Sequence, residues 1–221
     1  DFNLYIKHLC DIFDEVKRCL RKDGTCWVNL GDTYNSHSAN SKNVGGFEGK
    51  QMKNNKEYAD TKIATKKYIS LPDKSLCNIP SRFSIEMQNR GWILRNKIIW
   101  HKPNCMPSSV TDRFTVDFEE IFFFTKNKKY WFEQQFEDLQ ESSLSRMNYA
   151  YNKGKRHTNK YADAINVKTI EASKERIKQN GRNKRTVWKI PTQPFPEAHF
   201  AVFPEALVET PIKAGCPKDI C

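Results

Sequence analysis

The sequence lacks two features that would define its class at once. It contains no apolar run near the roughly 18 residues that a membrane-spanning helix needs. Its seven cysteines include no pair at C-x-x-C spacing, and their number is odd, which argues against the common zinc and redox motifs and against a disulfide framework. We therefore expect free, buried thiols in a reducing cytoplasm, no metal site and no membrane partner.

Length and composition are those of one soluble domain with room for an inserted subdomain. The chain has 221 residues, of which 38% are hydrophobic and 29% charged. It has no initiator methionine and no apolar signal segment at its start, and it opens directly inside a helical pattern. These features predict that the chain is a fragment of a longer protein.

The net charge of +11 is concentrated in two segments. Residues 151–186 hold eleven basic and three acidic side chains, and residues 38–74 hold eight basic and four acidic ones. A near-neutral body with two basic inserts is typical of a protein that binds a phosphate backbone. A solvated, lysine-rich surface is the alternative interpretation.

Hydrophobic periodicity predicts an α/β fold. Residues 4–21 repeat apolar positions at i, i+3 and i+4, which predicts an amphipathic helix, with Gly24 after its end. The apolar positions are Leu9, Ile12, Phe13, Val16 and Leu20. Residues 25–30 then predict a short buried strand that stops at a polar cluster, and this succession is one step of a doubly wound sheet.

The middle of the chain predicts a second helix and two more strands. Ser81 is expected to cap a helix over 81–89 that buries Phe83, Ile85 and Met87. Residues 93–100 and 119–125 are rich in β-branched and aromatic side chains, and the run IFFF suits a strand covered on both faces. Pro103 ends the first of these strands, and 130–132 is expected to be a return strand.

Composition divides the chain into three parts. Residues 1–135 form the first, with a long basic loop at 35–70, and residues 136–186 are a polar, basic insert with a helix expected at 169–179. Residues 187–221 resume an ordered body, in which Pro204 fits the first turn of a helix that is expected to bury Leu207, Val208 and Ile212.

Four stretches carry a resemblance to a known family. The central one, at 91–113, reads GW-x-LR-x-x-IIW-x-KPN-x-MP-x-S-V-x-DR. The others are EVKRCLRKDGTCWVNLGDTY, FEEIFFFTKNKKYWF and VWKIPTQPFPEAHFAVFPEALVETPIKAGCP. In this order they resemble the site-specific DNA methyltransferases that modify cytosine N4 or adenine N6, in the group whose catalytic motif precedes the cofactor motif.

The resemblance implies a partial Rossmann-like sheet that uses S-adenosylmethionine and acts on double-stranded DNA with a flipped-out base. The family holds the target amine with an Asp, Asn or Ser followed by Pro-Pro and an aromatic residue, and it binds the cofactor at Phe-x-Gly-x-Gly. Neither motif occurs in the sequence. The resemblance therefore implies that both motifs lie outside the chain, which would be a central fragment that is inactive alone. It also implies that the whole protein serves a modification or restriction–modification system in the cytoplasm and is encoded by a prokaryote or a phage.

The remaining family-like residues have supporting roles. Asn29, Gly31 and Asp32 are supporting candidates beside the absent catalytic motif, and Phe203, Pro204 and Leu207 are expected to line the cofactor pocket. The candidate DNA contacts are Lys102, Ser108, Arg113, Lys153, Lys155, Arg156, Arg182, Lys184 and Arg185. Asp32 as a turn or cap residue, Arg113 as a surface ion pair and Phe203 as plain core are the alternatives.

Two other functions remain open at this point. The chain could be a non-catalytic DNA-binding remnant, or an RNA or protein methyltransferase on the same fold. Relatives sometimes carry a zinc ribbon after the AGCP segment, and Cys221 could be its first thiol, although no metal is expected here.

Overall fold

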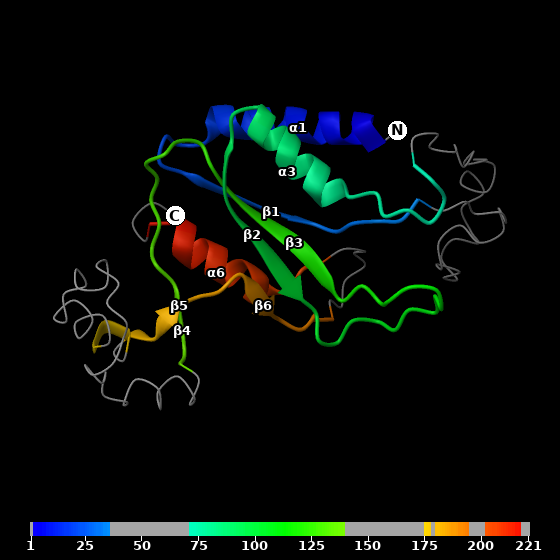
Figure 1. Ribbon diagram of the computed structural model, residues 1–221. Coiled ribbons are helices and arrows are strands. Elements are labelled where there is room, and N and C mark those ends of the chain that lie inside the picture. Colours follow the sequence, from blue (N-terminus) through cyan, green and yellow to red (C-terminus); the bar gives the residue numbers. More distant parts are fainter. Residues whose placement is uncertain (1, 36–70, 140–174, 178–179, 195–201, 218–221) are drawn as a thin grey trace, which may run out of the picture.

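A mixed sheet organises the chain (Figure 1). The computed structural model describes residues 2–35, 71–139, 175–177, 180–194 and 202–217. Its strands are β1 (Thr25–Leu30), β2 (Ile93–His101), β3 (Phe118–Thr125) and β6 (Val187–Lys189), in the spatial order β1-β3-β2-β6. A separate pair joins β4 (Phe136–Glu137) to β5 (Arg182–Asn183).

The strand directions produce one functional edge. β3 pairs antiparallel with both β1 and β2, and β6 pairs parallel with β2, so β1, β2 and β6 all run the same way. Their carboxyl ends therefore meet at the edge where β3 begins, as in the registers Leu30↔Glu120 and His101↔Phe118. The α/β class expected from the sequence is confirmed, with a mixed sheet.

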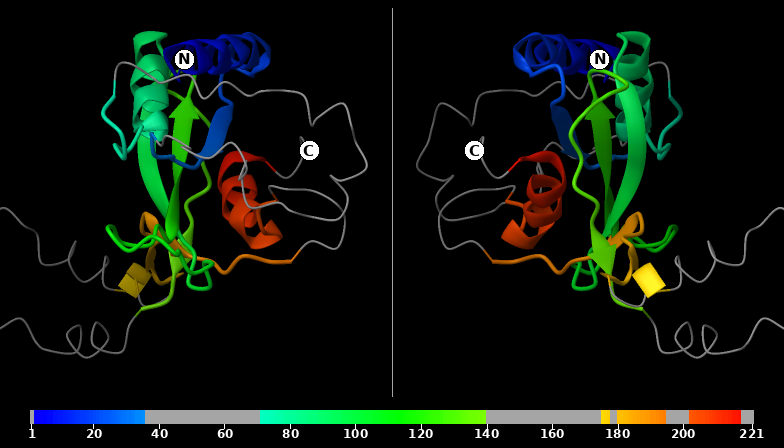
Figure 2. Two further views of the ribbon diagram at one scale, coloured as in Figure 1. Left: turned by 90° about the vertical axis from the view of Figure 1, so that its right-hand side faces the viewer. Right: turned by 90° about the vertical axis from the view of Figure 1, so that its left-hand side faces the viewer.

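Helices cover the two faces of the sheet unequally. Helices α1 (Phe2–Cys19) and α3 (Ile79–Asn89) pack on one face, and α6 (Glu205–Gly215) packs on the other (Figure 2). The central strand β3 is covered on both faces, because Ile121, Phe122, Phe123 and Phe124 are all at most 3% exposed. The sequence-based prediction for this strand is confirmed.

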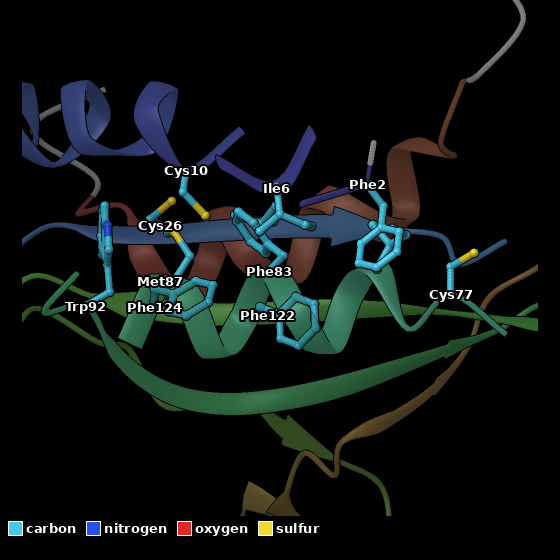
Figure 3. Packing of buried hydrophobic residues seen from close by; sticks show 12 residues of the cluster. Phe2, Ile6, Cys10, Cys26, Cys77, Phe83, Met87, Trp92, Phe122 and Phe124 are labelled. Carbon is cyan, nitrogen blue, oxygen red and sulfur yellow. The ribbon is translucent and has the colours of Figure 1, made fainter. Parts of the chain in front are cut away.

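The larger core lies between α1, α3 and the sheet (Figure 3). Phe83 sits at its centre, 5.3 Å from Phe13 and 6.1 Å from Phe124 between ring centroids, with both rings edge-on. The smaller core, under α6, gathers around Trp100, Ile121 and Leu207. The two faces of one sheet thus hold separate aromatic clusters.

Several element boundaries differ from those predicted. Helix α1 buries Phe2, Ile6 and Cys10, whereas Ile12 is 61% exposed. Helix α3 starts at Ile79 behind Asn78, whose φ of 56° is left-handed, so Ser81 is not its cap. Ile85 in the same helix is 59% exposed, so its predicted burial is wrong.

Residues 130–132 do not form the expected return strand. They run along the sheet as an extended segment, with Phe132 stacked on Phe123 at 5.6 Å and Trp131 N–H donating to the carbonyl of Asp23. The apolar alternation there reflects packing of rings onto the sheet rather than a ladder.

The cysteines agree only in part with the expectation. Cys10, Cys26 and Cys77 are free and buried, and burial raises the pKa of Cys26 to about 12. Cys19 is free but exposed, and Cys216 is in a disulfide, so the expectation of buried free thiols is wrong at these two positions. Cys221 lies outside the described residues.

One arginine ties α1 to α3. Arg90 follows α3 and donates from Nη1 to Asp11 at 2.8 Å and to Asp14 at 2.7 Å, and from Nε to Glu86 at 2.8 Å. Its side chain is 19% exposed, so solvent screens these bonds less than an open surface pair. Arg90 therefore bonds to three carboxylates at the junction of the two helices.

This junction predicts a pH dependence of stability. Hydrogen bonds from Lys7 and Arg90 lower the pKa of Asp11 below 3.8, and bonds from Arg90 and Asn89 lower the pKa of Glu86 below 4.5. A depressed carboxyl pKa stabilises the folded state above its unfolded value, and this contribution is lost as the pH falls through the folded value. The relevant window is below about pH 4.5.

We therefore expect Arg90→Met to lower stability at pH 7 and to flatten the loss of stability between about pH 5 and pH 3. Urea unfolding followed by circular dichroism at several pH values measures both effects. Arg18→Met is the matched control, since Arg18 pairs with Glu15 in the same helix but both side chains are about 70% exposed. Parallel pH curves for Arg90→Met and the unmodified protein would contradict the expectation.

Candidate functional site at the carboxyl edge of the sheet

The candidate site is the edge where β1, β2 and β6 end. Ligands in α/β sheets bind at the carboxyl ends of parallel strands, because the connections that leave there converge. Three connections leave this edge, after Leu30, after His101 and after Lys189. The first two connections carry five of the family-like residues named from the sequence: Gly31, Asp32, Lys102, Ser108 and Arg113. A sixth, Asn29, lies in β1 one residue before its end.

The first connection is fixed by Asp32. Its Oδ1 accepts hydrogen bonds from the backbone N–H of Thr33 at 2.8 Å and of Ile79, the first residue of α3, at 3.0 Å. Asp32 thus caps the start of α3 and joins it to the end of β1. Asn29, inside β1, donates its side-chain amide to the backbone carbonyl of Glu120 at 3.2 Å.

A second anchor closes this connection. Asn35 is 6% exposed and donates its side-chain amide to the carbonyls of Leu71 and Pro72 at 2.8 and 3.1 Å. Tyr34 forms an isolated antiparallel bridge with Leu76. Residues 33–35 and 71–77 therefore lie side by side at the candidate edge.

The second connection begins with a partly buried ion pair, and the sequence pointed to only one of its members, Lys102. Lys102 Nζ donates to Glu119 Oε1 and lies 4.5 Å from the Trp100 ring. Both side chains are mostly buried, at 19% and 26% exposed. The Glu119 carboxylate also lies close to Gly31: a Cβ atom placed on Gly31 would be 3.7 Å from it. Glu119 therefore lies between the ends of β1 and β2 at the candidate edge.

Further along the same connection, Arg113 lies over the ring of Tyr34, with its guanidinium carbon 3.9 Å from the ring centroid. The neighbouring Asp112 pairs with Lys74 at 2.5 Å, and this hydrogen bond lowers the pKa of Asp112 below its usual value. Ser108 accepts a hydrogen bond from the backbone of Val110, which is a local turn. Lys102 and Arg113, far apart in the connection, are thus both placed at this edge.

The other described DNA candidates lie elsewhere. Arg182 and Arg185 both donate to Glu137 Oε1, at 2.7 and 2.6 Å, and Lys184 donates to Thr210 at 2.8 Å. Burial opposes the charge of Glu137, but bonds from the Arg185 backbone and from both guanidinium groups hold its pKa below the ordinary range. We call Glu137, Arg182, Lys184 and Arg185 the Glu137 cluster. It precedes β6 and lies far from the β2–β3 connection (Figure 1).

The Glu137 cluster borders a cavity of about 210 Å³ between α6 and the sheet. Trp27, Trp188 and Phe132 line its apolar part, and Asn96, Lys184 and Arg185 its polar part. Trp27 is stacked on Phe123, with centroids 4.2 Å apart. The strand sequences indicated these aromatic residues as core, so only the fold could reveal that they border a cavity. Lys153, Lys155 and Arg156 lie outside the described residues.

The three cofactor candidates differ in what they could contact. Leu207 is 3% exposed in the core under α6, and Pro204 is the buried N-cap of that helix. Phe203 is 52% exposed, so its ring is the part of this set that could lie against a cofactor. The set therefore fits S-adenosylmethionine only through Phe203, while the other two position α6.

Within the described ranges, no helix is long and apolar enough to cross a membrane. In the same part of the chain, no group of three or more His, Cys, Asp or Glu side chains is arranged to hold a metal ion.

Comparison with known proteins identifies the family. The family model described as DNA methylase, for N6 and N4 methylation, matches residues 1–220. The chain belongs to this family of DNA methylases.

Three type II methyltransferases are among its relatives. M.SmaI of Serratia marcescens is 35% identical over 215 residues, which cover 97% of this chain and 60% of that protein. M.XycI of Xanthomonas campestris pv. cyanopsidis and M.Cfr9I of Citrobacter freundii are each 34% identical over 212 residues, 96% of this chain and 56% of theirs. The chain thus spans somewhat more than half the length of these relatives.

Proposed function

We propose that the chain is part of a DNA amino-methyltransferase that transfers a methyl group from S-adenosylmethionine to cytosine N4 or adenine N6. The observation that carries the proposal is the candidate edge. Asn29 near the end of β1, Gly31 after it, and Lys102 and Arg113 after β2 lie where the parallel strands end. Membership in the DNA methylase family supports this function.

In this proposal the chain supplies the frame, and other parts of the protein supply the chemistry. The described edge provides a partly buried Lys102–Glu119 pair and an exposed arginine, which suit the positioning of a nucleotide and its phosphates. S-adenosylmethionine, when bound, would supply the methyl group, with Phe203 against it. The residues that hold the target amine lie outside these 221, and the 221 residues alone are inactive.

The names of the relatives support a biological setting. They are type II methyltransferases, so we place this protein in a site-specific modification or restriction–modification system in the cytoplasm of a prokaryote. A non-catalytic DNA-binding remnant is the second candidate, favoured by the absence of Pro-Pro and of Phe-x-Gly-x-Gly from the sequence.

The test is transfer of a labelled methyl group from S-adenosylmethionine to mixed-sequence DNA by the full-length protein, with the 221-residue chain assayed in parallel. We expect label only with the full-length protein, recovered after digestion as N4-methylcytosine or N6-methyladenine. DNA binding without transfer by the full-length protein would favour the non-catalytic remnant. Label in RNA, in protein or at carbon 5 of cytosine would contradict the proposal.

A further inference from the structure

The connection between β2 and β3, residues 102–117, displays two large apolar side chains to solvent. Phe114 is 95% exposed and Met106 is 88% exposed, more than any other large apolar side chain in the described part of the chain. Figure 1 shows this connection reaching out beyond the end of the sheet. The ring of Phe114 therefore leaves almost all of its apolar surface in water, and burying it against a partner would be favourable.

The base of this connection is held in place. Lys102 N–H donates to the carbonyl of Asp117 at 2.7 Å, which closes the two ends of the connection on each other. Asn104 and Thr192 exchange two hydrogen bonds, from Asn104 Nδ2 to the Thr192 carbonyl at 3.1 Å and from Thr192 N–H to Asn104 Oδ1 at 2.9 Å. The connection is therefore tied to the segment that follows β6.

The residues just before Phe114 are also held. Asp112 is paired with Lys74, and Arg113 lies over Tyr34, so two consecutive side chains bind to the neighbouring first connection. Phe114 is the next residue, and its ring points to solvent although its neighbours are anchored. The chain thus presents an apolar ring to solvent next to a guanidinium group that contacts Tyr34.

We propose that Phe114 is a wedge that enters the DNA duplex between base pairs, with Arg113 beside it at the phosphate backbone. The inference rests on the proposed function and deepens it. Enzymes that modify a base amine must take the base out of the stack, and proteins that open base steps insert apolar side chains such as phenylalanine between them. The net charge of +11 and the adjacent arginine favour DNA over an apolar protein surface as the occupant.

The test compares two duplexes of the same mixed sequence, one intact and one with a single abasic site. A wedge fills the gap of an abasic site without having to unstack bases, so the full-length protein should bind that duplex roughly tenfold more tightly. Fluorescence anisotropy at fixed salt measures both dissociation constants. Phe114→Ala should reduce the preference to near one, and Phe114→Trp should keep it.

Ile12→Ala is the matched control, because Ile12 is a large exposed apolar residue on α1 and should leave the preference unchanged. Equal preference in the unmodified protein and in Phe114→Ala would overturn the wedge and leave DNA binding intact. Failure to bind either duplex at low salt would overturn the proposed function and the wedge with it. A clear fall in melting temperature of Phe114→Ala would assign the ring to a protein contact and also overturn the wedge.

Discussion

Replacing Phe122 with alanine is expected to lower the free energy of unfolding by about 3–5 kcal/mol. Phe122 is fully buried at the middle of β3, between the rings of Phe83 and Phe124 at 6.3 and 6.0 Å. Its removal leaves a cavity in a core that two helices and three strands share. For a chain of this size the melting temperature should fall by roughly 10 °C.

Ile12→Ala and Ile85→Ala are the controls for this prediction. The periodicity of the sequence places both in the core, whereas the structure exposes them by 61% and 59%. Each should change stability by less than about 0.5 kcal/mol. A loss at Ile12 comparable to that at Phe122 would show that the outer face of α1 is buried in the protein in solution. Urea unfolding provides all three values.

Replacing Arg182, Lys184 and Arg185 together with alanine is expected to flatten the salt dependence of DNA binding by roughly two units of slope or more. The slope is that of log K against log salt concentration, and each lost phosphate contact removes about 0.9. In the absence of DNA these three side chains bind Glu137 and Thr210, so they must exchange these partners for phosphates.

Glu137→Gln should tighten DNA binding, because it removes the charge that both arginines must leave to reach phosphates. The slope should stay unchanged, since the complex contains the same phosphate contacts as before. Glu133→Gln is the matched control, since it makes the same charge change four residues earlier without releasing Arg182 or Arg185. Equal affinities for the two variants, together with an unchanged slope in the triple alanine variant, would show that this cluster serves β4 and β5 alone.

The sequence predicted the parts of the fold that local patterns determine. The run Ile121–Phe124 has no polar residue, so a strand covered on both faces was the consistent interpretation. Gly91 follows α3 with a φ of 81°, a left-handed conformation that favours glycine. In α1, the burial predicted for Ile12 is wrong, because the buried face is the one that carries Phe2, Ile6 and Cys10. The more numerous apolar residues further along the helix obscured this stripe in the sequence.

The candidate site was predictable only where a residue stands at a strand end. Lys102 and Arg113 could be named because they follow a buried strand. Glu119 could not, since its partner Lys102 is 17 residues away and the pair forms only when β2 and β3 align. The hydrogen bond from Arg185 to Glu137 joins residues that are 48 positions apart in the sequence, so it too forms only in the assembled fold.

The position of β3 in the sheet also sets the order in which the chain can fold as it is synthesised. Thr25 in β1 pairs with Thr125 in β3, so β1 has no sheet neighbour until one hundred further residues have been made. At roughly 5–20 residues per second, the ribosome releases β1 about 5–20 s before its partner. During that interval α1 can pack against α3, but the core face of β1 has no partner strand beside it. The segment of α1 and β1 in the nascent chain is therefore a natural client for chaperones, and β3 is the strand whose arrival ends that dependence.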